Sequence, residues 1–133
     1  MQQFDHEKLE VYQAAIRFVV LANDVVEALP RGRGYIGDQL SRAATSIALN
    51  IAEGAGEHSG TEKARFYRIA RRSATECAAV LDVCAQLGLV TPERFGTGRE
   101  LLLRIVSMLT KLGRSVVSGT GTGTGTGTDR TDP

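Results

Sequence analysis

The sequence predicts an all-α fold: an antiparallel up-down-up-down four-helix bundle followed by a disordered tail. Apolar residues recur at spacings of 3 and 4 in four separate segments, which is the pattern of amphipathic helices. Tryptophan is absent and aromatic residues make up 5% of the chain, so we expect a mainly aliphatic core. The connections between the segments are short, which favours antiparallel neighbours. The 133 residues fit one domain, with the bundle in residues 1–118 and the tail in residues 119–133.

The first helix is predicted from Asp5 to Leu29, where Pro30 and the following glycines end it. It carries two apolar seams, and a helix with two seams needs two partners. These are either two helices of the bundle, or one such helix and another subunit. One seam comprises Leu9, Tyr12, Ile16, Val19 and Val26, and the other comprises Val11, Ala15, Phe18, Ala22, Val25 and Leu29.

The second helix is predicted from Asp38 to Gly56, with Gly54 and Gly56 as its stop because glycine tolerates the left-handed conformation of a C-cap. Beside its apolar seam runs a polar stripe of Gln39, Arg42, Ser46, Asn50 and Glu53. We expect Arg42, Asn50 and Glu53 to form hydrogen bonds between helices or between subunits, since partly buried polar groups need partners. Binding of a ligand by this stripe is the alternative.

The third helix is predicted to begin after a capping box of Ser59 and Glu62, with Thr61 as the alternative N-cap, and to reach Leu87. The fourth helix starts at Thr91-Pro92, a typical N-cap and first-turn pair. Gly96 and Gly98 weaken its first turn, so we expect regular helix only from about Arg99 to Val117.

Alternating Gly and Thr fill residues 119–128. These side chains bury too little area to offset the entropy of ordering, so we expect the tail to be disordered.

Cysteine usage and hydropathy indicate a soluble, cytoplasmic protein. Cys77 and Cys84 lie seven residues apart on one predicted helix, a rise of about 10 Å that excludes a mutual disulfide. We expect two buried thiols in a reducing compartment. The polar N-terminus is unlike a signal peptide, and no apolar run approaches the roughly 20 residues of a membrane span.

Arginines crowd the first half of the third predicted helix. Arg65, Arg68 and Arg72 share a face, and guanidinium groups suit phosphate contacts, so this face is a candidate nucleic-acid-binding site. Arg31 and Arg33 in the first loop, and also Arg42, are candidates to extend it. The alternative is a solvated face in which Arg72 pairs with Glu76. The net charge of +1 gives no strong global attraction for nucleic acid.

Nothing in the sequence predicts catalysis, a metal site or a cofactor. The two histidines, His6 and His58, have no cysteine or second histidine at metal-ligand spacing. No nucleophile, base and orienting group can be assembled from the residues present. We therefore expect a protein that is not an enzyme.

The segment QLSRAATSIALNIAEGAG (residues 39–56) resembles the signature of small bacterial four-helix bundle proteins, the 23S rRNA intervening-sequence proteins. The segments FDHEKLEVYQAA and RFYRIARRSATEC are similar to that family's first and third helices. The matching residues of the signature are Gln39, Leu40, Arg42, Ala43, Ser46, Ile47, Asn50, Ile51, Ala52, Glu53, Gly54 and Gly56.

The resemblance implies an antiparallel bundle that assembles as a homopentamer, in which the signature residues hold bundle and ring together. It also implies similarity to the accessory variability determinant of diversity-generating retroelements, which works with a reverse transcriptase and nucleic acid. The family name records where some of its genes lie, within rRNA genes.

The hypothesis is therefore a non-enzymatic, homo-oligomeric scaffold that engages RNA or an RNA–protein complex. A protein–protein adaptor without nucleic acid is one alternative. An accessory protein of a retroelement reverse transcriptase is another, although this chain is less basic than such proteins tend to be.

Overall fold

The computed structural model describes residues 2–122, and the surroundings of side chains up to residue 117. It contains a short 3₁₀ helix, η1 (Asp5–Lys8), and four α-helices: α1 (Glu10–Glu27), α2 (Gly34–Gly56), α3 (Gly60–Gln86) and α4 (Pro92–Thr122). The predicted all-α four-helix bundle is confirmed. The predicted disordered tail comprises residues 119–133, but α4 continues through residues 119–122 and ends five residues later than expected, so the prediction is wrong for these four residues. The rest of the predicted tail, residues 123–133, lies outside the described residues.

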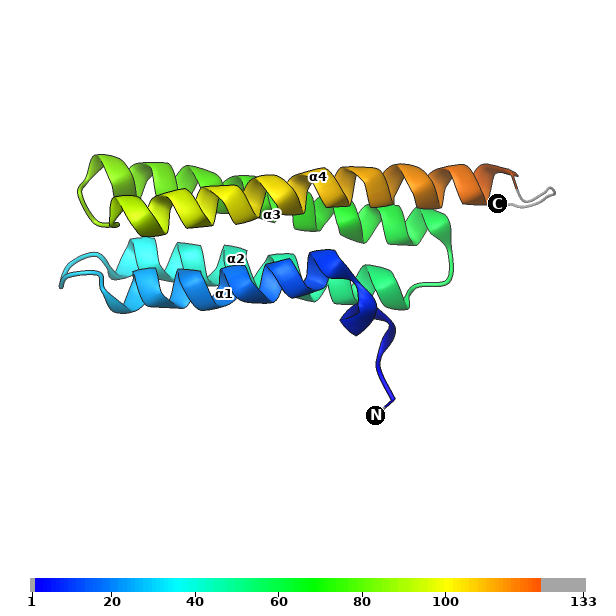
Figure 1. Cartoon of the computed structure of the whole chain (residues 1–133), viewed down its shortest axis with the longest axis horizontal. Coiled ribbons are helices and arrows are strands. Elements are labelled where there is room, and N and C mark those ends of the chain that lie inside the picture. Colours follow the sequence, from blue (N-terminus) through cyan, green and yellow to red (C-terminus); the bar gives the residue numbers. More distant parts are fainter. Residues whose placement is uncertain (1, 123–133) are drawn as a thin grey trace.

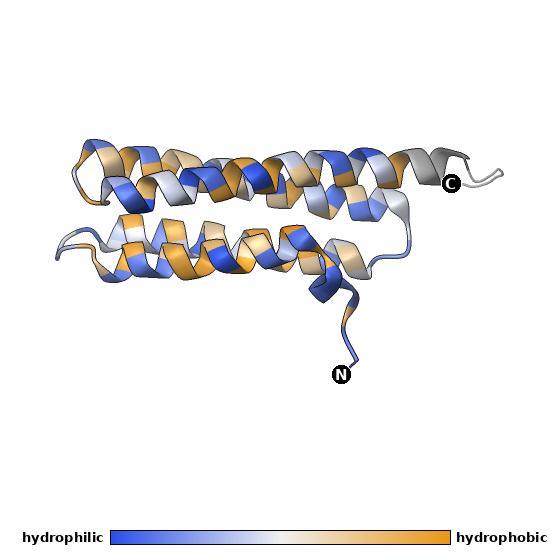
Figure 2. Cartoon of the chain, viewed as in Figure 1, coloured by the Kyte–Doolittle hydropathy of each residue, from blue (hydrophilic) through white to orange (hydrophobic). Residues whose placement is uncertain are grey.

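The four helices pack as the sides of a square, because α1 contacts α2 and α4, and α3 contacts the same two helices. Figure 1 shows the α1–α2 and α3–α4 loops at one end of the bundle and the α2–α3 loop at the other. Hydrophobic and hydrophilic residues alternate along every helix (Figure 2), as expected for helices with one buried face. In the described part of the chain, no helix is long and apolar enough to cross a membrane.

The core is built from aliphatic residues of all four helices around the ring of Phe18, which is fully buried. Of the two seams predicted on α1, the one containing Phe18 faces this core, with Val11, Ala15, Ala22 and Val25 also buried. Most of the other seam is half-buried against the edge of the core, where α1 meets its neighbours, while Ile16 is 40% exposed. The two seams of α1 therefore find partners within a single bundle.

The first helix is shorter than predicted at both ends. Leu9 is extended, with φ −83° and ψ 127°, and it separates η1 from α1. At the other end α1 stops at Glu27, because the residue before a proline disfavours helical backbone and Leu29 precedes Pro30. The prediction of one continuous helix from residue 5 to 29 was wrong.

Two helices begin earlier than predicted, because tertiary packing overrides the low helix propensity of glycine. The second helix begins at Gly34 instead of Asp38, and Ile36 in its first turn is buried. The fourth begins at Pro92 instead of near Arg99. Its Gly98 is buried where a Cβ would lie 2.9 Å from Cδ1 of Leu81 and 3.2 Å from Cδ2 of Leu21.

The two predicted N-caps are confirmed. Ser59 Oγ accepts a hydrogen bond from the Glu62 backbone N–H at 3.2 Å. Thr91 Oγ1 accepts one from the Arg94 N–H at 3.1 Å. Each bond satisfies one of the N–H groups that a helix start leaves unpaired. The third helix ends at Gln86, and Gly88 follows with a φ of 69°, a left-handed conformation that favours glycine.

Gly54 and Gly56 do not act as the predicted left-handed stop. Only Gly32 and Gly88 among the described glycines have positive φ. Gly54 instead lies inside α2, and a Cβ on it would be 2.6 Å from Cε1 and 2.9 Å from Cδ1 of Tyr67. The absence of a side chain lets the buried Tyr67 ring of α3 lie directly against the α2 backbone.

Lys63 closes the same end of α2. Its Nζ donates to the backbone carbonyls of Gly54 at 3.2 Å and Ala55 at 2.9 Å. These carbonyls belong to the last turn of α2, where a cation also interacts favourably with the helix dipole. One lysine near the start of α3 therefore ties the two helices together across their short loop.

Both thiols are buried and unpaired, as predicted. Burial, and secondly the nearby Glu76 carboxylate, raises the pKa of the Cys77 thiol to about 12. Burial also raises the pKa of Cys84. Both groups are therefore protonated and poorly nucleophilic at neutral pH.

We predict that Gly54→Ala destabilises the protein while Gly56→Ala does not. Alanine gains about 1 kcal/mol of helix propensity at an interior position, but overpacking against Tyr67 costs about 1–3 kcal/mol. A Cβ at Gly56 meets nothing within 4 Å. The urea midpoint should fall for Gly54→Ala and stay constant or rise for Gly56→Ala. Equal midpoints for the two variants would show that the ring has room to move.

We predict that native Cys77 and Cys84 resist iodoacetamide at pH 8, while both react in guanidinium, as read by mass spectrometry. A thiol of pKa 12 is ionised in only about one molecule in ten thousand at that pH. The folded-state pKa values lie above those of unfolded thiols, so unfolding releases protons. The free energy of unfolding should therefore fall as the pH rises above about 8.5. Rapid native alkylation at pH 8 would contradict this.

Candidate nucleic-acid interface

The three arginines predicted to share a face of α3 do so. Arg65, Arg68 and Arg72 are all exposed, at spacings that bring them to one side of the helix. They lie in the first half of α3, at the end of the bundle that holds the α2–α3 loop (Figure 1). Their role in binding nucleic acid stays a prediction.

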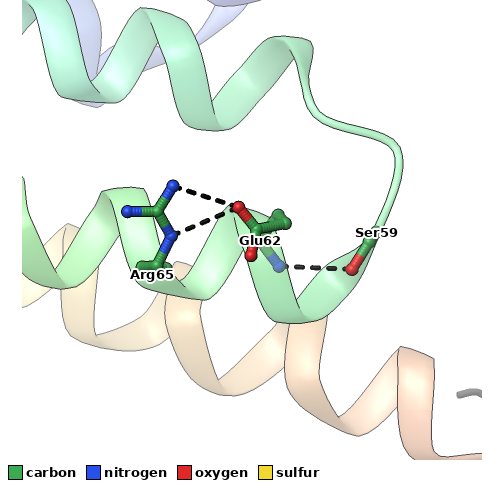
Figure 3. A network of polar contacts seen from close by, with 3 residues as sticks. All are labelled: Ser59, Glu62 and Arg65. Carbon is green, nitrogen blue, oxygen red and sulfur yellow. Dashed lines mark hydrogen bonds and ion pairs between the residues drawn. The ribbon is translucent and has the colours of Figure 1, made fainter.

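Arg65 is the most restrained member of this face. Its Nε and Nη2 donate to Oε1 of Glu62 at 3.2 and 3.1 Å (Figure 3). Its guanidinium carbon also lies 4.4 Å from the centroid of the Phe66 ring, a cation–π geometry. The Glu62 carboxylate, predicted as half of a capping box, therefore pairs with Arg65, and only the Ser59 half of the box is present.

Among the described residues, Arg68 and Arg72 have no carboxylate partner. The alternative prediction paired Arg72 with Glu76, but the single ion pair among the described residues joins Arg65 and Glu62. Two exposed guanidinium groups are thus available for an anion from outside the chain.

Arg31 and Arg33 lie at the opposite end of the bundle. They belong to the loop between α1 and α2, whereas Arg65 and Arg68 follow the loop between α2 and α3 (Figure 1). Arg33 Nη1 donates to the Tyr35 hydroxyl at 3.1 Å. Within one chain these loop arginines therefore do not extend the face on α3, as the sequence suggested they would. Their contact with nucleic acid stays a prediction for a separate surface.

Within the part of the chain that the structure describes, the polar stripe on α2 makes one hydrogen bond between helices. Ser46 Oγ and Ser73 Oγ lie 2.9 Å apart, joining α2 to α3. Asn50 Nδ2 donates to the Ser46 carbonyl at 2.9 Å and to Ser46 Oγ at 3.0 Å, so it bonds within its own helix. Gln39, Arg42 and Glu53 are exposed. The expectation that Arg42, Asn50 and Glu53 bridge helices is therefore wrong within one chain.

A cleft between α3 and α4 adds two arginines that the sequence did not bring together. Its lining includes Arg71 from α3 and Arg114 from α4, with Arg68 shared between the cleft and the outer face of α3. The cleft has a volume of about 450 Å³. The sequence does not predict the place of Arg114 opposite α3, because that place depends on the register of two antiparallel helices, which no local pattern gives.

No group of three or more His, Cys, Asp and Glu residues is arranged to hold a metal ion within residues 2–122. The arrangement offers instead guanidinium groups at a surface and in an adjoining hollow. Guanidinium groups arranged in this way suit contacts with anions.

The model of one protein family, described as 23S rRNA-intervening sequence protein, matches residues 7–111. The chain belongs to this family. The match runs from the second half of η1 through most of α4 and includes the whole polar stripe of α2. No curated protein has a sequence significantly similar to it.

A crystal structure from Bacteroides thetaiotaomicron is similar to this member of the family, with a TM-score of 0.72. That protein is described as one of unknown function from the S23 ribosomal protein family. The alignment covers 78% of this chain and 98% of that one at 21% sequence identity. The likeness therefore concerns the fold.

Proposed function

We propose that this family member is a non-enzymatic, homo-oligomeric scaffold that engages RNA or an RNA–protein complex through the arginines of α3. The observation that carries the proposal is the pair Arg68 and Arg72, which are exposed and have no carboxylate partner in the described chain. On a chain of net charge +1, this local concentration of cations is the surface best suited to phosphates.

Self-assembly is supported by the face that α2 and α3 present. Tyr35, Leu49 and Val83 are exposed there by 62%, 60% and 49%. Leu49 adjoins the stripe residues Ser46 and Asn50 in one shallow hollow, and Tyr35 and Val83 line another. Large apolar side chains next to partly satisfied polar groups are typical of surfaces that become buried in an assembly.

The family resemblance makes a homopentamer the expected assembly. A five-fold ring would repeat each arginine face five times, and avidity would strengthen contacts that are weak in one chain. This repetition offsets the low net charge.

A protein–protein adaptor without nucleic acid is the alternative that a specific observation favours. Exposed apolar side chains occur on all four helices, and include Ile16, Val20, Val83 and Leu103. Such an adaptor would bind a protein and no RNA. A retroelement accessory role would supply a reverse transcriptase as the partner, and a reverse transcriptase gene beside this one would support it.

We predict that Arg68→Gln/Arg72→Gln weakens RNA binding at least about tenfold at 50 mM salt and reduces the salt slope by about 2. The matched control is Arg99→Gln/Arg104→Gln, two exposed arginines of α4 outside the site. Fluorescence anisotropy with a labelled decauridylate gives both values. Equal losses in the two double variants would show that binding follows net charge. A purified wild type that binds no RNA would favour the adaptor.

We predict that Asn50→Leu changes the size of the assembly, because it removes the donor that orders Ser46 beside the exposed apolar residues of α2. Size exclusion with light scattering measures the mass, and the control is Gln13→Leu on the exposed side of α1. If the Asn50→Leu protein keeps the wild-type mass and melting temperature, the polar stripe is not part of the interface between subunits. Absorbance at 260 nm in the same run reports co-purifying nucleic acid.

A further inference from the structure

The cleft between α3 and α4 combines a cationic rim with an apolar floor. The residues that line it are Ala64, Tyr67, Arg68, Arg71, Leu109, Thr110, Gly113, Arg114 and Val117. Three of these are arginines and none is acidic. The volume of about 450 Å³ is much larger than a phosphate ion needs.

The antiparallel register of the two helices gathers the three guanidinium groups. Arg71 Nη1 donates to Thr110 Oγ1 at 3.3 Å, which fixes these residues opposite each other. Arg68 lies about one turn before Arg71, and Arg114 lies about one turn after Thr110. Because the helices run in opposite directions, both steps lead toward the same end of the bundle. Arg68 and Arg114 therefore face each other across the cleft.

The charges of these three arginines are not balanced by a carboxylate in the described residues. None forms an ion pair with a carboxylate in the part of the chain that the structure describes. Arg71 is half-buried, and the Thr110 hydroxyl is the only hydrogen-bond acceptor that its side chain reaches there. Like charges in a partly desolvated hollow repel one another, and an anion is the ligand that relieves this.

The floor of the cleft is apolar and can therefore contact an apolar part of a ligand. Leu109 and Tyr67 are buried beneath it, and Val117 contributes an exposed apolar edge. Tyr67 is 3% exposed, and its hydroxyl has no hydrogen-bond partner among the described residues, although buried polar groups normally have one. Gly113 leaves the wall open, since a Cβ there would meet nothing within 4 Å.

We propose that this cleft binds one nucleotide unit, with its phosphate held by Arg68, Arg71 and Arg114 and its sugar and base over the apolar floor. A phosphate would balance the charges of the three arginines. The remaining volume and the apolar floor favour a ligand that is larger than phosphate and partly apolar. The inference rests on the proposed engagement of RNA and specifies where that contact is made. An RNA strand and a free nucleotide share this chemistry.

The test compares three variants of the whole chain with one charge-matched control variant. Arg71→Gln/Arg114→Gln removes two cations that belong only to the cleft, and Arg99→Gln/Arg104→Gln is the charge-matched control. Gly113→Leu fills the hollow without opposing the helix, because leucine is a better helix former than glycine. Tyr67→Phe removes only the hydroxyl. Circular dichroism melting curves confirm that each variant folds.

The probes are uridine monophosphate, followed by calorimetry, and a labelled decauridylate, followed by anisotropy, both at 50 mM salt. We expect the double cleft variant and Gly113→Leu to weaken binding of at least one probe more than tenfold. The control should change it less than threefold, and Tyr67→Phe should weaken it severalfold. Loss with decauridylate alone identifies a strand as the ligand, and loss with the monophosphate as well identifies a single nucleotide.

Other outcomes separate this inference from the proposed function. Decauridylate binding that is lost in Arg68→Gln/Arg72→Gln but unchanged in the cleft variants would contradict nucleotide binding in the cleft. It would still agree with the proposed RNA-binding scaffold. Binding of the monophosphate in the cleft, with no binding of decauridylate anywhere, would support nucleotide binding in the cleft and contradict the proposed RNA-binding function. Inorganic phosphate that competes as well as the monophosphate would overturn the inference, because the floor would then contribute nothing.

Discussion

The contact between Gly54 and Tyr67 is the constraint on which the rest of the structure depends. A Cβ at residue 54 would lie 2.6 Å from the tyrosine ring, so only a glycine allows α2 and α3 to approach this closely. Lys63 holds the same end of α2 by donating to the carbonyls of Gly54 and Ala55. On its other side Tyr67 lines the α3–α4 cleft. The residue that sets the spacing of two helices therefore also shapes the floor of the candidate site.

Much of the fold could be predicted from the sequence, because the helices are amphipathic and their caps are local. The seam through Phe18 and the N-caps at Ser59 and Thr91 appear as expected. The positions of Gly54 and Gly98 inside helices could not be predicted in this way, since a local pattern indicates only the low helix propensity of glycine. At both positions, side chains of neighbouring helices occupy the space that a Cβ would take, so the packing requires glycine. That requirement becomes visible only when the helices are packed.

The candidate site was only half predictable for a related reason. Residues on one helix face are separated by fixed intervals, so the face of Arg65, Arg68 and Arg72 follows from spacing alone. Residues on two helices meet according to register, and the sequence carries no local sign that Arg71 faces Thr110. The topology also places the loop arginines far from the arginine face of α3, although the sequence suggested that they would extend it. Arg31 lies at the other end of the bundle from Arg65 because one full helix runs between their loops.

Net charge is a poor guide to what this surface can bind. Sixteen basic and fifteen acidic residues nearly cancel over the chain, yet screening limits each exposed charge to a range of about 10 Å at 0.1 M ionic strength. Within such a range an anion at the α3–α4 cleft meets three arginines and no carboxylate in the lining. Glu76, which follows Arg71 by five residues, is not among the residues that line the cleft, and Glu62 is paired with Arg65. The lining of the cleft is therefore cationic, although the molecule as a whole is almost neutral.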